Sequence, residues 1–454
     1  MAIISGVLGR IKSDLEPYLS ASSIRCACDR LGHRYRRRQF DPVSTIHLFV
    51  LQILCFNTAL THLRHLAKMP MTAAAFCKAR KRLPLAVLQL LLRDSAAAMA
   101  RTCRAGNSRA LWQGLRTWLV DGSSTITPDC PALDKAFGHP SGQKKGCGFP
   151  VPKLLGLFDA YTGLIVEVLC LPLFTHEMSQ VSRLHPLLGS GDLLVGDRGF
   201  CSYAHLALLS LRQVAGCFRL HQRHIVSFRE GRKSRGKGQR GKPQSTFLKR
   251  LGQYDQLVRW RKPPRQLKTK WITATQYEQL PDTLVLRELR YHLQGRGRRT
   301  RVVTIVTTLL DPVAYPKARI ADLFGMRWQV ETHFAELKTT LKMRKLKCRT
   351  VAGVQKELAV YALVYNLVHA VMLKAAARQK VDPDRISFLD TIRWLLSALP
   401  GESMPELIVN PRRPGRHEPR VIKDLQDTYR KMTKSRAYLR LHPQWANRKR
   451  KGLS

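Results

Sequence analysis

One stretch of the chain, residues 319–343, limits the possible folds more than any other. An α-helix advances by about 100° per residue, and this step places five apolar side chains on one stripe. They are Leu323, Val330, Phe334, Leu337 and Leu341. An adjacent strip carries, in order, Phe324, Arg327, Glu331 and Lys338. The pattern predicts a helix that buries one flank and presents the other to a site.

A carboxylate between two cations suits a metal ligand with phosphate-binding groups on either side. The same pattern is typical of an exposed helix with a ladder of ion pairs between Arg327, Glu331 and Lys338. By itself the stretch favours the ladder, and the rest of the chain reverses that preference.

The balance of charge predicts a polyanionic partner. Among 454 residues, 78 Lys and Arg stand against 31 Asp and Glu, which gives a formal net charge of +47. A folded chain with this charge repels itself unless a polyanion neutralises it, and nucleic acid does so by releasing its counterions. An anionic membrane would require a concentrated basic amphipathic helix or a lipidation signal, and the sequence shows neither. We therefore predict nucleic acid as the partner and no membrane association.

The cysteines indicate a reducing compartment. Eleven are scattered along the chain without a C-x-x-C pair, which favours free thiols over a disulfide framework. Cys26, Cys28 and His33 are a weak hint of zinc, because their spacing fits no standard finger. We expect no signal peptide, and the apolar runs at 46–60 and 358–373 are short for a membrane span. These features predict a cytoplasmic protein with buried apolar helices.

Residues 1–110 predict an all-α domain. Apolar residues recur every three or four positions, and prolines mark the expected turns. Basic clusters at 34–38 and 78–82 interrupt this pattern. Small basic helical domains commonly grip duplex DNA. We predict a DNA-binding domain here, with a helical packing domain that has a solvated basic face as the alternative.

From residue 111 the pattern changes to strands, and two acids lie where strands end. A strand at 115–120 precedes Asp121 and Gly122, and a buried strand at 192–196 precedes Asp197. Acids in such positions reach the edge of a sheet, where ligands bind. The other expected elements are strands 153–160, 164–171 and 215–220 and helices 177–188, 203–212 and 354–374.

Asp121, Asp197 and Glu331 are therefore candidate ligands of two divalent cations. Mg²⁺ prefers oxygen ligands and keeps positions for water and substrate phosphate. Two such ions clamp the attacking and leaving oxygens of a phosphodiester. Neither D-G-S nor D-R-G is specific alone, and the prediction depends on their order and on the later helix.

At this point the sequence resembles the DDE transposases of bacterial insertion sequences, in the IS-four group. That group carries D-G after one strand, D-R-G-[FY] after another, and the helix signature Y-x2-R-x3-E-x6-K. The matching residues are Asp121-Gly122, Asp197 to Phe200, and Phe324, Arg327, Glu331 and Lys338. Phe324 replaces the family's Tyr, which removes a hydroxyl that could touch DNA and keeps the ring. The register favours Glu331 over Glu336 as the third acid.

The resemblance covers most of residues 40–375 and implies an α/β fold with an RNase H-like catalytic domain. It also implies a β-rich insertion before the last acid, after an all-α N-terminal domain. The implied cofactor is a pair of Mg²⁺ ions, for which Mn²⁺ can substitute. Arg198, Phe324, Arg327 and Lys338 are the candidate DNA contacts.

The expected domains are 1–110 (helical, DNA-binding), 111–220 and 311–400 (two parts of the catalytic domain), 221–310 (β-rich insertion) and 401–454 (basic C-terminal tail). Expected strands of the insertion are 217–220, 256–260, 271–274, 283–289 and 301–307. The run 229–242, rich in Lys, Arg and Gly, is either a phosphate-gripping arm or a solvated linker. Trp260 and Trp271 are candidates to stack a flipped base, although core positions are favoured.

The implied activity is transposition: binding of the ends of an insertion sequence, metal-dependent cleavage, and joining of the freed 3′-OH to target DNA. The implied partners are double-stranded DNA and a second copy of the chain on that DNA, in the bacterial cytoplasm at the nucleoid. Two alternatives stay open. One is a nuclease that cuts without joining, and the other is a non-catalytic DNA-binding protein, which the intact set of acids disfavours.

Overall fold

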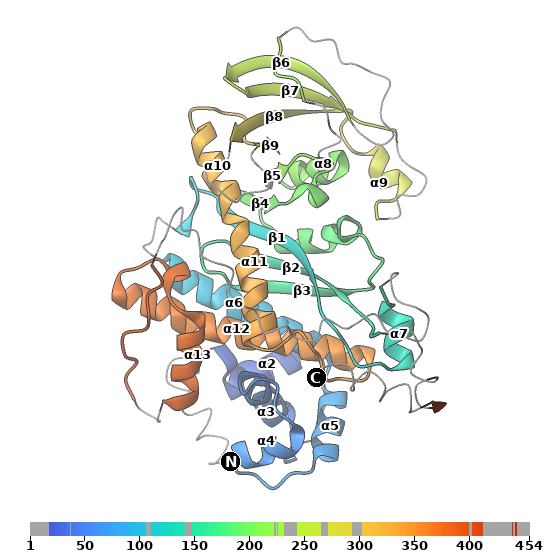
Figure 1. Ribbon diagram of the computed structural model, residues 1–454, viewed down its shortest axis with the longest axis vertical. Helices are drawn as coiled ribbons and strands as arrows, with labels where there is room; N and C mark the ends of the chain where they lie inside the picture. The colour runs from blue at the N-terminus through green and yellow to red at the C-terminus, as the bar shows by residue number, and fades with distance from the viewer. Residues whose placement is uncertain are drawn as a thin grey trace, which may run out of the picture.

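A single mixed β-sheet organises the protein (Figure 1). The computed structural model describes residues 18–36, 38–105, 110–140, 148–221, 224, 226–230, 243–264, 271–292, 302–398, 402–411, 438 and 441–442. Within them, nine strands lie in the order β3-β2-β1-β4-β5-β9-β8-β7-β6. Helices of the N-terminal part lie at the opposite end of the molecule from β6 and β7.

Five strands make the first part of the sheet: β1 (Arg116–Ser124), β2 (Lys153–Asp159), β3 (Ile165–Leu171), β4 (Asp192–Gly196) and β5 (Ala215–Arg219). The first three pair antiparallel, whereas β4 is parallel to β1 and to β5. This arrangement confirms the predicted RNase H-like fold and the predicted strands. Helix α8 (Tyr203–Leu211) crosses from β4 to β5 as predicted. The helix predicted at 177–188 is wrong: two 3₁₀ helices, η2 (Glu177–Ser179) and η3 (Val181–Leu187), lie there, and Pro186 stands inside the second.

The strands of the insertion continue the same sheet. Strand β9 (Val302–Thr307) pairs antiparallel with β5, and β8 (Thr283–His292), β7 (Asp255–Arg261) and β6 (Gln244–Gly252) follow outward. The strand predicted at 271–274 is wrong, because Thr273 caps the short helix α9 (Ala274–Glu278) with a capping box. Most of the run 229–242 lies outside the described residues, so its role as arm or linker stays open.

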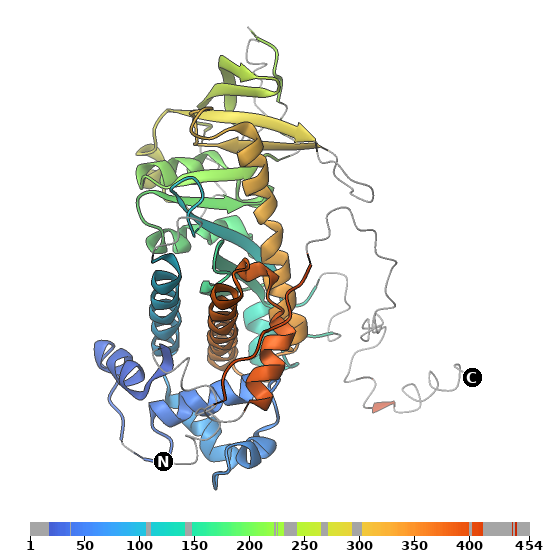
Figure 2. The same cartoon turned by 90° about the vertical axis from the view of Figure 1, so that its left-hand side faces the viewer.

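The N-terminal helices share their core with the sheet. They are α2 (Ala21–Arg30), α3 (Pro42–Leu54), α4 (Leu60–Leu66), α5 (Ala73–Arg82) and α6 (Leu85–Arg104). The long helix α12 (Val351–Gln379) packs against α3, α6 and β3 (Figure 2). One hydrophobic cluster therefore runs from Phe49 of α3 through Val364 of α12 to Phe158 of β2. The predicted helix under the sheet is confirmed and extended by several residues at both ends.

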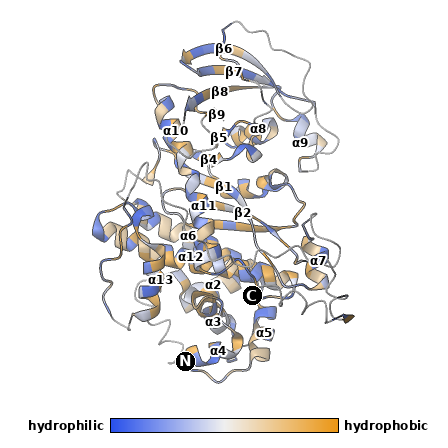
Figure 3. Cartoon of the chain, in the orientation of Figure 1, coloured by the Kyte–Doolittle hydropathy of each residue, from blue (hydrophilic) through white to orange (hydrophobic). Residues whose placement is uncertain are grey.

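Hydrophobic residues run along α12 (Figure 3), and by length and composition this helix could cross a membrane. Helices α5 and α6 would pass the same test only as one span bent by 76°. Of the most apolar window of α12, 89% is buried inside the protein, so the core accounts for its apolar surface. The remaining helices are α7 (Pro131–Phe137), η4 (Arg198–Phe200), α10 (Lys317–Met326), α11 (Trp328–Ala335), η5 (Glu336–Thr340), η6 (Pro383–Arg385) and α13 (Phe388–Ser397).

Candidate active site

The first two acids are brought together by the register of two parallel strands. Val120 pairs with Gly196, so Asp121 and Asp197 are the next residues along neighbouring strands. Asp121 does not follow the end of its strand, as predicted, but lies within β1. The reason is that β1 keeps pairing with β2 as far as Ser124, whereas its pairing with β4 stops at Val120. Both acids therefore lie where the two strands separate.

The third acid comes from a segment that is less regular than the predicted helix. The helix assignment is interrupted at Arg327, between α10 and α11, and the π-helix η5 follows from Glu336. A π-turn holds an extra residue, so the step of 100° per residue fails beyond Glu336. Lys338 still faces the site, because its Nζ donates to Ser123 Oγ on β1 at 3.2 Å.

Arg327 connects the first acid to the third. Its guanidinium donates to Asp121 Oδ2 at 3.2 Å and to Glu331 Oε1 at 3.3 Å. The Arg327 side chain is only 8% exposed, whereas that of Glu331 is 49% exposed. The guanidinium also lies over the rings of Phe324 and Trp328. A buried cation thus sits between two acids at the position where their charges need compensation.

Electrostatic compensation of the acids is incomplete. Burial raises the pKa of Asp121, the Gly122 amide and Arg327 act to lower it, and Asp197 and Glu177 raise it further. Asp197 Oδ1 is buried and has no hydrogen-bond partner among the described residues. Buried acceptors without a partner are rare and destabilising. Carboxylate oxygens whose negative charge is not fully compensated suit a divalent cation of the Mg²⁺ class as ligands.

A fourth carboxylate lies at this site, and sequence reasoning missed it. A Cβ added at Gly122 would lie 2.4 Å from Glu177 Oε1 and 2.6 Å from Glu177 Cδ, so the carboxyl group packs directly on β1. The negative charge of Glu177 also raises the pKa of Asp121. The available signal was an acid soon after the third strand, which the prediction of a helix at 177–188 treated as a helix start.

The carboxylates of Asp121, Asp197 and Glu331 do not surround one common position for an ion. Within the described part of the chain, a different group, His333, Glu336 and His369, is the one whose ligand atoms all lie within 4.8 Å of one another. Arg327 holds Asp121 and Glu331 through its two terminal nitrogens instead.

The other predicted site residues are distributed differently. Arg198 is exposed on η4, directly after Asp197. Phe324 is 4% exposed, so a direct contact of its ring with DNA is not supported, because the ring packs beneath Arg327 in the core. Trp260 is buried and donates from Nε1 to Glu288, which confirms its core position. Trp271 packs partly buried against the core on the same face of the sheet.

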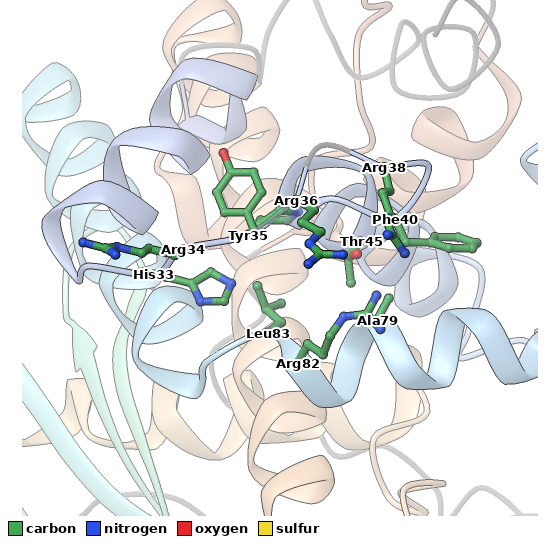
Figure 4. A pocket seen from close by; sticks show the side chains of 11 residues that line it. His33, Arg34, Tyr35, Arg36, Arg38, Phe40, Thr45, Ala79, Arg82 and Leu83 are labelled. Atoms are coloured by element: carbon green, nitrogen blue, oxygen red, sulfur yellow. The ribbon is translucent and has the colours of Figure 1, made fainter.

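The basic clusters of the N-terminal part meet in one pocket of about 680 Å³. Figure 4 shows Arg36, Arg38 and Arg82 extending toward the same gap, beside Phe40. Clustered arginines next to an aromatic ring suit phosphate and base contacts. The pocket therefore marks where the two basic clusters present their charge together.

Comparison with known proteins identifies the family. Residues 112–367 match the family model described as "Transposase DDE domain". The chain belongs to this family. The transposase is 26% identical over 332 residues to "Transposase InsG for insertion sequence element IS4" of Escherichia coli (strain K12), an alignment covering 69% of each chain. A piggyBac transposase synaptic complex with hairpin DNA, solved by cryo-EM, aligns with a TM-score of 0.41 and 10% identity, covering 86% of this chain and 79% of that one.

The predicted family, fold and activity are therefore confirmed: this protein is a DDE transposase with an RNase H-like catalytic fold. It acts in DNA transposition, its partner is DNA, and its domain type uses a divalent metal.

Proposed function

We propose that this transposase binds the ends of its element, hydrolyses a phosphodiester there with Mg²⁺, and joins the freed 3′-OH to target DNA. The observation that carries the proposal is the convergence of Asp121, Asp197 and Glu331, with Arg327 bridging two of them and Asp197 Oδ1 buried without a partner. Such a set of carboxylate oxygens supports binding of divalent cations.

The three acids would hold two Mg²⁺ ions, for which Mn²⁺ can substitute, and Glu177 would add a fourth carboxylate to the same site. When bound, the ions supply activated water and charge stabilisation at the attacking and leaving oxygens. The protein contributes orientation: Gly122 donates its N–H to Asp121 Oδ1 at 2.8 Å and so fixes that carboxylate. Arg327 offsets part of the charge of Asp121 and Glu331.

Phosphate binding would fall to cations around the acids. Lys338 and Arg327 line the site from the catalytic segment, and Arg198 lies exposed beside Asp197. Charge-assisted contacts with phosphate oxygens would hold the cut end in line. The arginine pocket of the N-terminal part would bind the duplex away from the cut.

We further propose a homodimer on DNA, in the bacterial cytoplasm at the nucleoid. We also propose a division of the chain into four parts. They are a helical DNA-binding domain (1–110), a catalytic domain in two segments (111–220 and 311–400), an insertion (221–310) and a basic tail (401–454). The boundary near residue 110 rests on the basic pocket of the N-terminal helices and not on packing, because these helices share one hydrophobic cluster with the sheet.

A joining assay tests the proposal. Purified full-length protein is given pre-cut element ends, a supercoiled target plasmid and Mg²⁺, and joined products are separated on a gel. We expect strand transfer that depends on the 3′-OH and is lost in Asp197→Asn. If a parallel reaction with uncut ends shows cleavage while the pre-cut ends give no joined product, the protein is a nuclease that cuts without joining.

A further inference from the structure

A second cluster of ligand-type side chains lies beneath the catalytic segment and takes no part in the proposed chemistry. His333 belongs to α11, Glu336 begins the π-helix η5, and Tyr365 and His369 lie one turn apart on α12. Glu336 Oε2 lies 3.6 Å from His333 Nδ1, 3.5 Å from His369 Nε2 and 3.3 Å from the Tyr365 hydroxyl. The cluster therefore joins two helices through one carboxylate.

The tautomer of His369 follows from its second neighbour. His369 Nδ1 lies 3.2 Å from the carbonyl oxygen of Thr162, which can only accept a hydrogen bond, so Nδ1 carries a proton. A neutral His369 then presents the lone pair of Nε2 toward Glu336 Oε2. Two acceptors facing each other repel unless a proton or a cation lies between them. A backbone carbonyl on the far nitrogen is also the usual way in which metal-binding histidines are oriented.

The Glu336 carboxylate oxygen Oε2 makes only long contacts within the cluster. His333 Nδ1 also lies 2.8 Å from the Tyr365 hydroxyl, a hydrogen bond that a bound ion would replace. Charge-assisted hydrogen bonds are normally about 2.7–2.9 Å long, whereas all three contacts of Glu336 Oε2 are longer.

The spacing of these atoms suits a common centre. Ligands bound to one tetrahedral ion at about 2.1 Å lie about 3.4 Å from one another. The distances of 3.5 and 3.6 Å from Glu336 Oε2 to the two imidazole nitrogens are close to this value, and all three ligand atoms lie within 4.8 Å of one another. A His-x-x-Glu pair on one helix facing a His on another is a familiar way to build a metal site inside a helix bundle.

We propose that His333, Glu336 and His369 bind one structural transition-metal ion of the Zn²⁺ class, with Tyr365 or water as the fourth ligand. Two imidazoles and one carboxylate favour Zn²⁺ over Mg²⁺, which prefers oxygen ligands alone. The ion would fix the π-turn of the catalytic segment to the core helix α12. Because Lys338 is two residues beyond Glu336, the ion would set the direction of that cation without touching DNA. This proposal is independent of the ions at the catalytic acids.

Metal counting on full-length protein without a histidine tag tests the site. The protein is stripped with a chelator, loaded with Zn²⁺ or Co²⁺, dialysed, and analysed by elemental mass spectrometry and visible absorption. The variant Asp121→Asn/Asp197→Asn/Glu331→Gln serves as background, because it removes ions bound by the catalytic acids. His369→Gln and Glu336→Gln are added to this background, and His65→Gln, on an exposed His of α4, is the matched control.

We expect one equivalent of Zn²⁺ in the background and in the His65→Gln control, and its loss in His369→Gln and in Glu336→Gln. The Co²⁺ form should show the visible bands of a four-coordinate ion without a thiolate charge-transfer band, which separates this site from the cysteines. No bound equivalent in the background would overturn the proposal and leave a cluster held by protons alone. Retention of the full equivalent in His369→Gln, or a thiolate band, would overturn it as well. Circular dichroism checks the fold, and if both variants unfold, the count and the spectrum of the background decide.

Discussion

Replacing Gly122 by Ala should lower the cleavage activity while leaving the stability of the protein nearly unchanged. The added Cβ would lie 2.4 Å from Glu177 Oε1 and 2.6 Å from Cδ, both closer than real Cβ contacts allow. The obstacle is the end of a flexible side chain, so Glu177 can swing away with little distortion of β1. Alanine is also favoured over glycine within a strand by about 0.5–1 kcal/mol. We therefore expect the free energy of unfolding to change by no more than about 1 kcal/mol, which shifts the melting temperature by less than about 4 °C.

The activity should respond differently, because the swing moves a carboxylate out of the site. A displacement of about 1 Å in catalytic machinery can lower a rate about a hundredfold. We expect Gly122→Ala to slow Mg²⁺-dependent cleavage of element ends by about ten- to a hundredfold. Glu177→Ala should have a similar effect, and the double variant should be no worse than Glu177→Ala alone, since both changes remove the same carboxylate.

Gly199→Ala is the matched control, because a Cβ there would meet no atom within 4 Å although the residue belongs to the D-R-G motif. Single-turnover cleavage rates and thermal melts of the wild type and the four variants measure both quantities. Wild-type cleavage by Gly122→Ala, or independent effects of Gly122→Ala and Glu177→Ala that multiply fully in the double variant, would refute the role of Glu177. A loss in Gly199→Ala as large as that in Gly122→Ala would refute the steric argument.

Three further predictions concern the acids, the phosphate contacts and the charge. Alanine at Asp121, Asp197 or Glu331 should abolish cleavage but leave the gel shift of element ends largely intact, and near-wild-type cleavage would remove that acid from the assignment. Lys338→Ala should weaken positioning of the cut end and be partly rescued by Mn²⁺, whereas Glu331→Gln should be rescued less, as rates against metal concentration would show. Affinity for DNA should fall steeply and linearly in a plot of log K against log salt. Deleting 229–242 should flatten that slope, and an unchanged slope would identify the run as a linker.

The two candidate aspartates could be singled out from the sequence because short apolar strands are local signals, whereas their assignment as catalytic acids stays a prediction. The strand before Asp197 is a short apolar run that the sequence reveals directly, whereas the parallel pairing of Val120 with Gly196, which places Asp121 beside Asp197, is seen only in the structure. The apolar stripe of the catalytic segment was equally readable, since Leu323, Val330 and Leu337 are all buried. The core of the fold follows from such patterns.

Features that depend on tertiary packing could not be read in the same way. The π-turn at Glu336 has no local signature, and its contact with Tyr365 of α12 joins residues far apart in sequence. Strand β6 was missed because it lies at the edge of the sheet and alternates poorly between buried and exposed residues. Glu177 reaches the site only because Gly122 leaves space for it, a fact about two segments far apart in sequence.

The path of the chain through the sheet has a consequence for how such proteins diverge. The chain leaves the catalytic strands after β5 and returns as β9, which pairs directly with β5. The segment between β5 and β9 is therefore an insertion whose two ends lie side by side in the sheet. Its length and content can therefore change during evolution without altering the distance from the first two acids to α10 and α11. One catalytic centre can in this way be combined with insertions of very different size.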